Sequence, residues 1–450
     1  MTTVFKHRHA KINALRPLST ETRDHYQHVT RPIDETYIAS EYVPSRLAQA
    51  EWQARGLETP KLQEIRLFRL ERIRQKLQEL DYAGIVVVDP MNIRYAVDAA
   101  NMQVWTLHNP MRYCFIPTEG PVILFDYSGC GHLSNHLALI TEVRPAKSWS
   151  YIIAAQRVDE MVERWAAELA DLVTQYGGGN RRLAMDRCNP EGVWALERKG
   201  VQLCNGEEVM ELARVIKSDE EIKAMRCAVV ACEEAMRVMQ EKLVPGITEL
   251  RLWSYLHAEN VARGGEWLEA RLLNSGPRTN PWYQECSDRV IEAGDLVAFD
   301  TDLIGPYGIC ADISRTWLCG DGKPSAEQKR LYQLAYEQIQ YNKNLLKAGM
   351  SFREITEKAR SLPDDCMPNR YSLLYHGVGM GDEYPDIFYL RDWEKFASDG
   401  ILAKNMVLCV ESYVGVAGGK EGVKLEEQLL ITETGVESLS SYPYEADFLS

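Results

Sequence analysis

The sequence predicts an α+β protein in which a smaller α/β domain precedes a larger domain of helices and antiparallel strands. Its 450 residues exceed the size at which a single hydrophobic core stays compact, so two domains are expected. Strand-like and helix-like segments alternate in the first half. The second half begins with a long helix and continues into hairpin-forming strands. We therefore expect an N-terminal arm at residues 1–60, an α/β domain at 61–215 and the larger domain at 216–450.

The composition is typical of a soluble protein that acts on small molecules. Apolar residues make up 45% of the chain, and a net charge of -14 disfavours binding to nucleic acid or to an anionic membrane. The N-terminus lacks the apolar core of a signal peptide, and no segment approaches the ~20 apolar residues of a membrane span. The eleven cysteines form no CxxC pair, which is typical of buried, reduced thiols. We expect a cytoplasmic protein.

The elements of the first half follow from periodicity. Residues 1–60 are polar and contain four prolines, which predicts either an arm lying over another surface or subunit, or a flexible extension. Apolar residues at helical spacing predict a helix over 62–80 and another over 157–176. The second helix ends at three glycines that no GK[ST] follows, so they are read as a helix terminus rather than a phosphate loop. Short apolar runs predict strands at four places: 84–89, 121–127, 181–186 and 201–204.

Serine caps mark the helices of the second half. Ser218 and Glu221 have the spacing of a capping box, and a long helix with apolar residues at helical spacing follows. Ser325 and Ser351 are further N-cap candidates. The other helices expected here span 245–265, 324–346 and 349–362. Antiparallel strands are expected between and after these helices.

Six acidic and imidazole side chains in the last third of the chain form the strongest chemical signal. They stand among β-branched and apolar neighbours, where an unpaired carboxylate is costly to desolvate: Asp300, Asp302, Asp312, His376, Glu411 and Glu426. Bound cations would remove that cost. Oxygen ligands with one imidazole suit Mn²⁺, Fe²⁺ or Zn²⁺, and bridging carboxylates suit a pair of ions. The alternative is a set of surface carboxylates with unrelated roles.

Strand geometry can bring three of these carboxylates together. Asp300 and Asp302 are two apart on an expected strand and project from the same face, which places the site on sheet rather than on loops. The GPYG segment at 305–308 then turns the chain. Asp302 and Asp312 lie opposite each other if the turn centres on Tyr307 or contains a bulge, with a glycine supplying a positive φ.

This order of Asp, Asp, His, Glu and Glu resembles the creatinase, prolidase and methionine aminopeptidase group. The segment LARVIKSDEEIKAMRCA at 212–228 is similar to the linker and first helix of that group. The resemblance covers residues 61–450. It implies a C-terminal pita-bread domain after a creatinase-like α/β domain, a binuclear metal centre and a homodimer. The string KLE matches the family ligand and selects Glu426 over Glu427.

Two positions depart from the peptidases of that group. Where they carry histidines, this chain has Trp282 in one segment, and Met380, Asp382 and Glu383 in the other. The segments NMQVWTLHNP and FDTDLIGPYGICADISR are similar to the DddP family of dimethylsulfoniopropionate (DMSP) lyases, which use this fold. This resemblance implies a carbon–sulfur lyase that converts DMSP to dimethyl sulfide and acrylate, with iron as the expected metal and manganese or zinc as alternatives.

The reaction suggests roles for four further residues. Elimination needs a base beside the metal ligands, and Asp382 fits this demand; the resemblance assigns it the same role, although a turn residue that bonds its own backbone is the alternative. The sulfonium of DMSP is a permanent cation that aromatic faces can receive. Tyr371 matches a family substrate position, and Trp105 and Trp282 are further candidates that could equally be packing residues.

Two other functions remain open from the sequence. An Xaa-Pro dipeptidase or aminopeptidase agrees with the fold and the ligands but lacks the two peptidase histidines. A pita-bread protein that has lost catalysis and only binds a ligand is the third hypothesis. It gives no physical reason to keep six ligand-type residues together in apolar segments.

Overall fold

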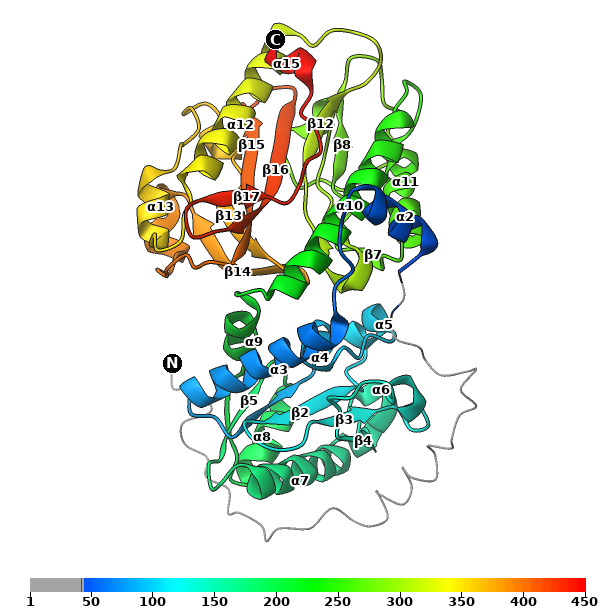
Figure 1. Cartoon of the computed structure of the whole chain (residues 1–450), viewed down its shortest axis with the longest axis vertical. Helices are drawn as coiled ribbons and strands as arrows, with labels where there is room; N and C mark the ends of the chain where they lie inside the picture. Colours follow the sequence, from blue (N-terminus) through cyan, green and yellow to red (C-terminus); the bar gives the residue numbers. More distant parts are fainter. Residues whose placement is uncertain (1–41, 43) are drawn as a thin grey trace. The chain divides into compact units, whose positions relative to one another are not determined.

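The computed structural model describes residue 42 and residues 44–450, which divide into two compact units (Figure 1). The first unit contains Leu62–Arg214. The second contains Pro44–Lys61 and Val215–Ser450. The greater part of the expected arm, residues 1–41 and 43, lies outside the described residues. No helix of the described part of the chain is both long and apolar enough to cross a membrane.

The first unit is an α/β domain built on a mixed six-stranded sheet of order β4-β3-β2-β1-β5-β6. Its strands are β1 (Gly84–Val87), β2 (Tyr113–Pro117), β3 (Ile123–Asp126), β4 (Glu142–Pro145), β5 (Arg182–Met185) and β6 (Gln202–Asn205). Its helices are α3 (Leu62–Glu79), α4 (Pro90–Val97), α5 (Gln103–His108), α6 (Tyr151–Ala154), α7 (Val158–Tyr176), α8 (Pro190–Arg198) and α9 (Gly206–Arg214). The four predicted strands are confirmed as β1, β3, β5 and β6.

Two strands of this sheet escaped the sequence analysis. Strand β2 follows a polar loop and ends in a proline, and β4 has the sequence EVRP, whose charges hide a strand pattern. Strand β2 is buried because it lies between β1 and β3, whereas β4 is a partly buried edge strand that pairs with β3. The glycine run after α7 does end the helix: the Gly177 N–H donates to the Val173 carbonyl, and Gly178 and Gly179 adopt positive φ.

The second unit has seven α-helices in its described residues. They are α2 (Arg46–Ala54), α10 (Asp219–Glu241), α11 (Glu249–Ala262), α12 (Ala326–Leu345), α13 (Phe352–Lys358), α14 (Trp393–Phe396) and α15 (Ala446–Leu449). The predicted serine caps are confirmed, since Ser218 and Ser325 form complete capping boxes and the Ser351 side chain accepts from the Glu354 N–H. Helix α12 packs along β15 and β16 and forms one side of the main core (Figure 1).

Helix α2 corrects the expectation of irregular chain up to residue 60. The Ser45 side chain caps it by accepting from the Ala48 N–H. Trp52 is buried, donates its indole N–H to the Cys227 carbonyl of α10 at 2.9 Å and stacks on Tyr307 with ring centroids 5.7 Å apart. One anchoring aromatic therefore orders a segment whose polar composition alone predicts no helix.

Antiparallel strands form the rest of the second unit. They are β7 (Trp267–Leu268), β8 (Leu273–Ser275), β9 (Leu296–Phe299), β10 (Leu303–Ile304), β11 (Cys310–Ala311), β12 (Arg315–Leu318), β13 (Leu373–Val378), β14 (Asp382–Phe388), β15 (Val407–Gly415), β16 (Gly422–Ile431) and β17 (Val436–Ser438). A five-stranded sheet has the order β14-β13-β15-β16-β17, and two three-stranded sheets have the orders β12-β9-β8 and β11-β10-β7.

The hairpin from β9 to β12 keeps one register throughout. Phe299 pairs with Arg315 at its base, and Leu303 pairs with Ala311 near its tip. This register centres the turn on Tyr307, which is one of the two alternatives that the sequence left open. Positive φ values occur at Tyr307 itself and at Gly308, whereas Gly305 stays at negative φ.

Candidate metal centre

The five-stranded sheet presents three of the predicted ligands on one face. Glu411 of β15 and Glu426 of β16 are direct cross-strand partners. His376 of β13 pairs with Cys409, which is two residues before Glu411 and so shares its face. The neighbouring Glu427 turns to the other face, where its carboxylate meets Lys343 at 2.8 Å and the Tyr444 hydroxyl at 2.7 Å.

The three aspartates lie where the hairpin from β9 to β12 is interrupted, and they do not belong to its strands. Asp300 and Asp302 fall between β9 and β10, and Asp312 falls between β11 and β12. The expectation that the whole site lies on sheet is therefore wrong for these residues. Thr301 causes the break, because its hydroxyl donates to the Ala311 carbonyl and accepts from the Ile313 N–H, each at 2.9 Å. Asp302 adopts a φ of 36°, which no regular strand allows.

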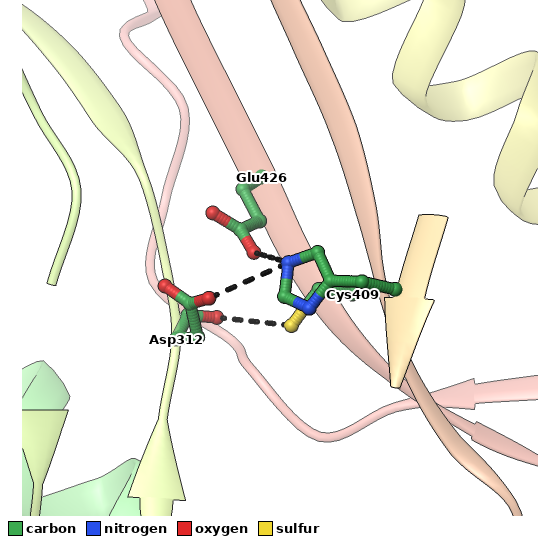
Figure 2. Close-up of side chains that lie close together, drawn as sticks. Asp312, Cys409 and Glu426 are labelled. Atoms are coloured by element: carbon green, nitrogen blue, oxygen red, sulfur yellow. Dashed lines mark hydrogen bonds and ion pairs between the residues drawn. The ribbon is translucent and has the colours of Figure 1, made fainter. Parts of the chain in front are cut away.

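The fold brings all six predicted ligands into one cluster, in which Asp302 is partly exposed and the other five residues are buried. Their donor atoms, together with the thiol of Cys409, form three overlapping groups, and all donor atoms of a group lie within 4.8 Å of one another. The groups are Asp312, His376, Cys409 and Glu426; Asp300, Glu411 and Glu426; and Asp300, Asp302 and Asp312. The His376 Nε2 atom lies 3.2 Å from Glu411 Oε1, 3.5 Å from Glu426 Oε1 and 3.6 Å from Asp312 Oδ2. Figure 2 shows the carboxylates of Asp312 and Glu426 converging on one imidazole.

Cys409 is a neighbour of the cluster that the sequence analysis did not select. Its thiol donates to the main-chain carbonyl of Asp312 at 3.8 Å (Figure 2). Burial, together with the charge of Glu426, raises the pKa of this thiol well above its ordinary value, so it stays protonated. The sequence could have indicated Cys409, because it precedes Glu411 by two residues on a strand and therefore lies on the same face.

Crowded negative charge perturbs the carboxylates strongly. Burial and neighbouring carboxylates raise the pKa values of Asp302 and Asp312 well above their ordinary range, and they raise the pKa of Glu411 to about 7. Burial also opposes ionisation of Glu426, but Lys424 and His376 hold its pKa well below the usual value. Without bound cations, ionising all of these carboxyl groups at once costs free energy.

The donor set fits a pair of divalent cations. Five carboxylates and one imidazole are the ligands that hard and borderline divalent metals take. The Glu426 Oε1 atom is buried and accepts no hydrogen bond from the described residues, which leaves it available as a ligand. The His376 Nδ1 atom lies 3.1 Å from the Gly377 carbonyl, so a proton on Nδ1 leaves Nε2 free to bind a metal.

Lys424 is a fully buried cation within this cluster, and the sequence analysis missed it. Its Nζ lies 2.9 Å from Asp300 Oδ2, 2.7 Å from Glu411 Oε2 and 3.0 Å from Glu426 Oε2. Burial alone lowers the pKa of Lys424, but these carboxylates raise it well above its ordinary value. The alternation that selects Glu426 also places Lys424, two residues earlier, on the same face.

Asp382 and Glu383 differ sharply in their surroundings. Asp382 begins β14, its side chain is 59% exposed, and its Oδ1 lies 3.6 Å from His376 Nδ1. It therefore borders the cluster and reaches solvent. Glu383 is buried, accepts from the Met380 N–H at 2.9 Å and pairs with Lys217 at 3.1 Å. A carboxylate held in this way is the weaker candidate for a base.

The structure places two of the three predicted aromatic residues beside the cluster. The Lys424 ammonium lies 4.8 Å from the ring centroid of Tyr371 and 6.0 Å from that of Trp282. Trp282 is buried against Tyr413, and Tyr371 stacks on Tyr283. Trp105 belongs to the first unit, where its side chain contacts Tyr127 and is 44% exposed.

Comparisons with known proteins place this geometry in a family. The model of metallopeptidase family M24 matches residues 223–433. The dimethylsulfoniopropionate lyase DddP of Roseovarius nubinhibens is 44% identical over 419 residues, which cover 92% of this chain and 94% of the relative. DddP of Roseobacter denitrificans is 42% identical over 407 residues, covering 89% and 91%.

Solved structures of peptidases share the fold. An Xaa-Pro dipeptidase from Bacillus anthracis superposes with a TM-score of 0.68 at 22% identity, covering 84% of this chain and 98% of that one. The prolidase from Pyrococcus horikoshii gives 0.67 at 21%, covering 84% and 99%. These likenesses confirm the expected α+β fold with a C-terminal pita-bread domain. The chain belongs to the DddP family, a branch of the M24 metalloenzymes.

Proposed function

We propose that this protein is a DMSP lyase, a carbon–sulfur lyase that splits DMSP into dimethyl sulfide and acrylate by β-elimination. The observation that carries the proposal is an exposed carboxylate, Asp382, beside a buried set of metal ligands. The two relatives named as DMSP lyases span nearly the whole chain at above 40% identity, which supports the same activity.

Six residues would hold the metal: Asp300, Asp302, Asp312, His376, Glu411 and Glu426. We propose a pair of divalent ions, with iron in line with the family resemblance and manganese or zinc as alternatives. A divalent ion bound there supplies Lewis acidity, which withdraws charge from the substrate carboxylate and stabilises an enolate-like transition state. The buried, low-dielectric surroundings of the ligands strengthen this effect.

Asp382 is the proposed base. Its carboxylate takes the proton from the carbon next to the substrate carboxylate. The electrons of that C–H bond form the carbon–carbon double bond of acrylate, and those of the C–S bond leave with neutral dimethyl sulfide. No oxidant or reductant is needed. Exposure keeps Asp382 ready to pass the proton to solvent, whereas the pairing of Glu383 with Lys217 uses that carboxylate structurally.

The sulfonium end of the substrate needs a receptor that offers no hydrogen bond. We propose that Tyr371 and Trp282 supply it, because aromatic faces attract cations. Trp105 belongs to the first unit and stays a prediction from the sequence. The proposal is supported by the ammonium of Lys424, which lies close to the rings of Tyr371 and Trp282. We further propose a cytoplasmic homodimer, in line with the resemblance to the family.

A peptidase remains the second candidate because of the shared fold. It is disfavoured by Trp282, which stands where the resemblance places a peptidase histidine and is buried against Tyr413. Without imidazoles at these positions, the site lacks donors for the tetrahedral intermediate of amide hydrolysis.

Product analysis tests the proposal directly. Purified, iron-loaded protein is incubated with DMSP, dimethyl sulfide is measured in the headspace, and acrylate is measured in solution. We expect equal amounts of the two products, and little of either from the Asp382→Asn protein. Full metal loading without any dimethyl sulfide release would exclude the lyase and favour the non-catalytic alternative. Hydrolysis of an Xaa-Pro dipeptide by the same preparation would favour the peptidase.

A further inference from the structure

The ammonium of Lys424 lies where a metal ion would meet three of the ligands. Its three ion-pair partners are Asp300, Glu411 and Glu426, at 2.9, 2.7 and 3.0 Å. The same three residues form one of the groups whose donor atoms converge within 4.8 Å. The ammonium also donates to Ser314 Oγ at 2.8 Å, so its three donors are satisfied inside the cluster.

The neighbouring part of the cluster contains the imidazole of His376 instead of an ammonium. Among the residues that the structure describes, no lysine or arginine forms an ion pair with Asp302 or Asp312. His376 Nε2 lies between Asp312, Glu411 and Glu426 and becomes a nitrogen ligand when a metal ion takes the place of its proton, whereas the Lys424 ammonium keeps its charge beside the ion. In the metal-free protein, the Asp300–Glu411–Glu426 position therefore contains an ammonium, whereas the Asp312–His376 position contains an imidazole.

We propose that the Lys424 ammonium occupies the Asp300–Glu411–Glu426 position in the metal-free protein. A metal ion binds there after, and more weakly than, an ion at the Asp312–His376 position. This inference rests on the proposed metal centre and adds an order of loading to it. The second ion must displace the ammonium from three carboxylates and then tolerate its charge nearby.

The surroundings of Lys424 limit how far its ammonium can retreat. The rings of Tyr371 and Trp282 border it, with centroids 4.8 and 6.0 Å from Nζ, and the whole side chain is buried. The displaced charge therefore stays close to the second ion. The charges still balance in the loaded site, because five ionised carboxylates and one ammonium leave four negative charges for two divalent ions.

Metal titration of the full-length protein tests the order of loading. Wild type, Lys424→Met and the control Lys343→Met are stripped with a chelator and titrated with Zn²⁺, while bound zinc is counted by elemental analysis. Methionine replaces the unbranched stem of lysine and removes the ammonium with its charge. Lys343 is a matched control, because it pairs with Glu427 on the other face of β16.

Wild type and Lys343→Met are expected to bind one zinc ion tightly and the second at least about tenfold more weakly. In Lys424→Met the second ion should bind at least about tenfold more tightly than in wild type. An unchanged or weaker second ion in Lys424→Met overturns the inference. Failure of wild type to bind zinc instead refutes the proposed metal centre, so the two failures are distinguishable.

A second variant covers the case in which Lys424→Met does not stay folded without metal. The comparison is then made on zinc-loaded proteins, from which zinc is withdrawn by graded chelator. Lys424→Arg keeps the positive charge and should release its second ion as readily as wild type, whereas Lys424→Met should retain it. Equal retention by the arginine and methionine variants contradicts the inference.

Discussion

Adjacent glutamates on β16 allow a sharp test of the site, because their side chains lie on opposite faces of the same strand. We compare Glu426→Gln with Glu427→Gln, since glutamine keeps the shape of the side chain, removes its charge and replaces one acceptor oxygen by an NH2 group. Glu426 faces His376 and Lys424. Glu427 faces Lys343, Tyr444 and Ser438 at 2.8, 2.7 and 3.1 Å.

The expected magnitudes follow from these partners. Glu427→Gln weakens a buried, charge-assisted contact to Lys343 but keeps an oxygen acceptor, so it should lower the free energy of unfolding by about 2 kcal/mol. Its metal content should stay near that of wild type. Glu426→Gln removes a ligand charge, and its metal affinity should fall by more than the about 10–100-fold that loss of an outer-shell partner costs.

The assay is metal content per chain by elemental analysis, alongside urea unfolding of the metal-free proteins. Both variants are purified with the same iron supply. If Glu427→Gln loses metal while Glu426→Gln retains it, the register assigned to β16 as the ligand strand is wrong. Equal metal loss in both variants would point to general unfolding, which the urea curves would reveal.

Three further predictions test the proposed chemistry. Asp382→Asn should retain its metal and lose about 10²- to 10⁴-fold in the rate of dimethyl sulfide release, which is typical of a lost general base; a fully metallated variant with near-normal rate would exclude Asp382. Asp312→Asn should lose both metal and rate, and a variant with full metal content would remove Asp312 from the ligand set. Xaa-Pro dipeptides should remain uncut with iron, manganese or zinc supplied, as measured by release of proline, and robust turnover would contradict the lyase assignment.

Three helices of the second unit, α10, α12 and α13, could be predicted because their signals are local. Ser218, Ser325 and Ser351 supply caps within one turn of each helix start, and the structure contains all three. Helix α2 and strand β4 could not be predicted in this way. Trp52 stabilises α2 through a contact with Cys227, 175 residues away in the chain, and β4 is a strand because β3 pairs with it.

The sequence by itself determined the six side chains that the candidate ligand set contains. Carboxylates among apolar neighbours require cations, and strand alternation separates Glu426 from Glu427. The family order of the ligands implied the same set. The same alternation places Lys424 on the face of the ligands, but its contacts with the carboxylates could not be predicted from the sequence.

Only the tertiary structure decided how these side chains meet. Thr301 breaks the hairpin and lets Asp302 leave the strand conformation. The convergence of the end of β9 with β15 and β16 surrounds Lys424 with carboxylates that are up to 124 residues distant in the chain. Exposure distinguishes Asp382 from its buried neighbour Glu383. Burial and charge pairing depend on segments that are far apart in sequence, and a local pattern carries no information about which of them will touch.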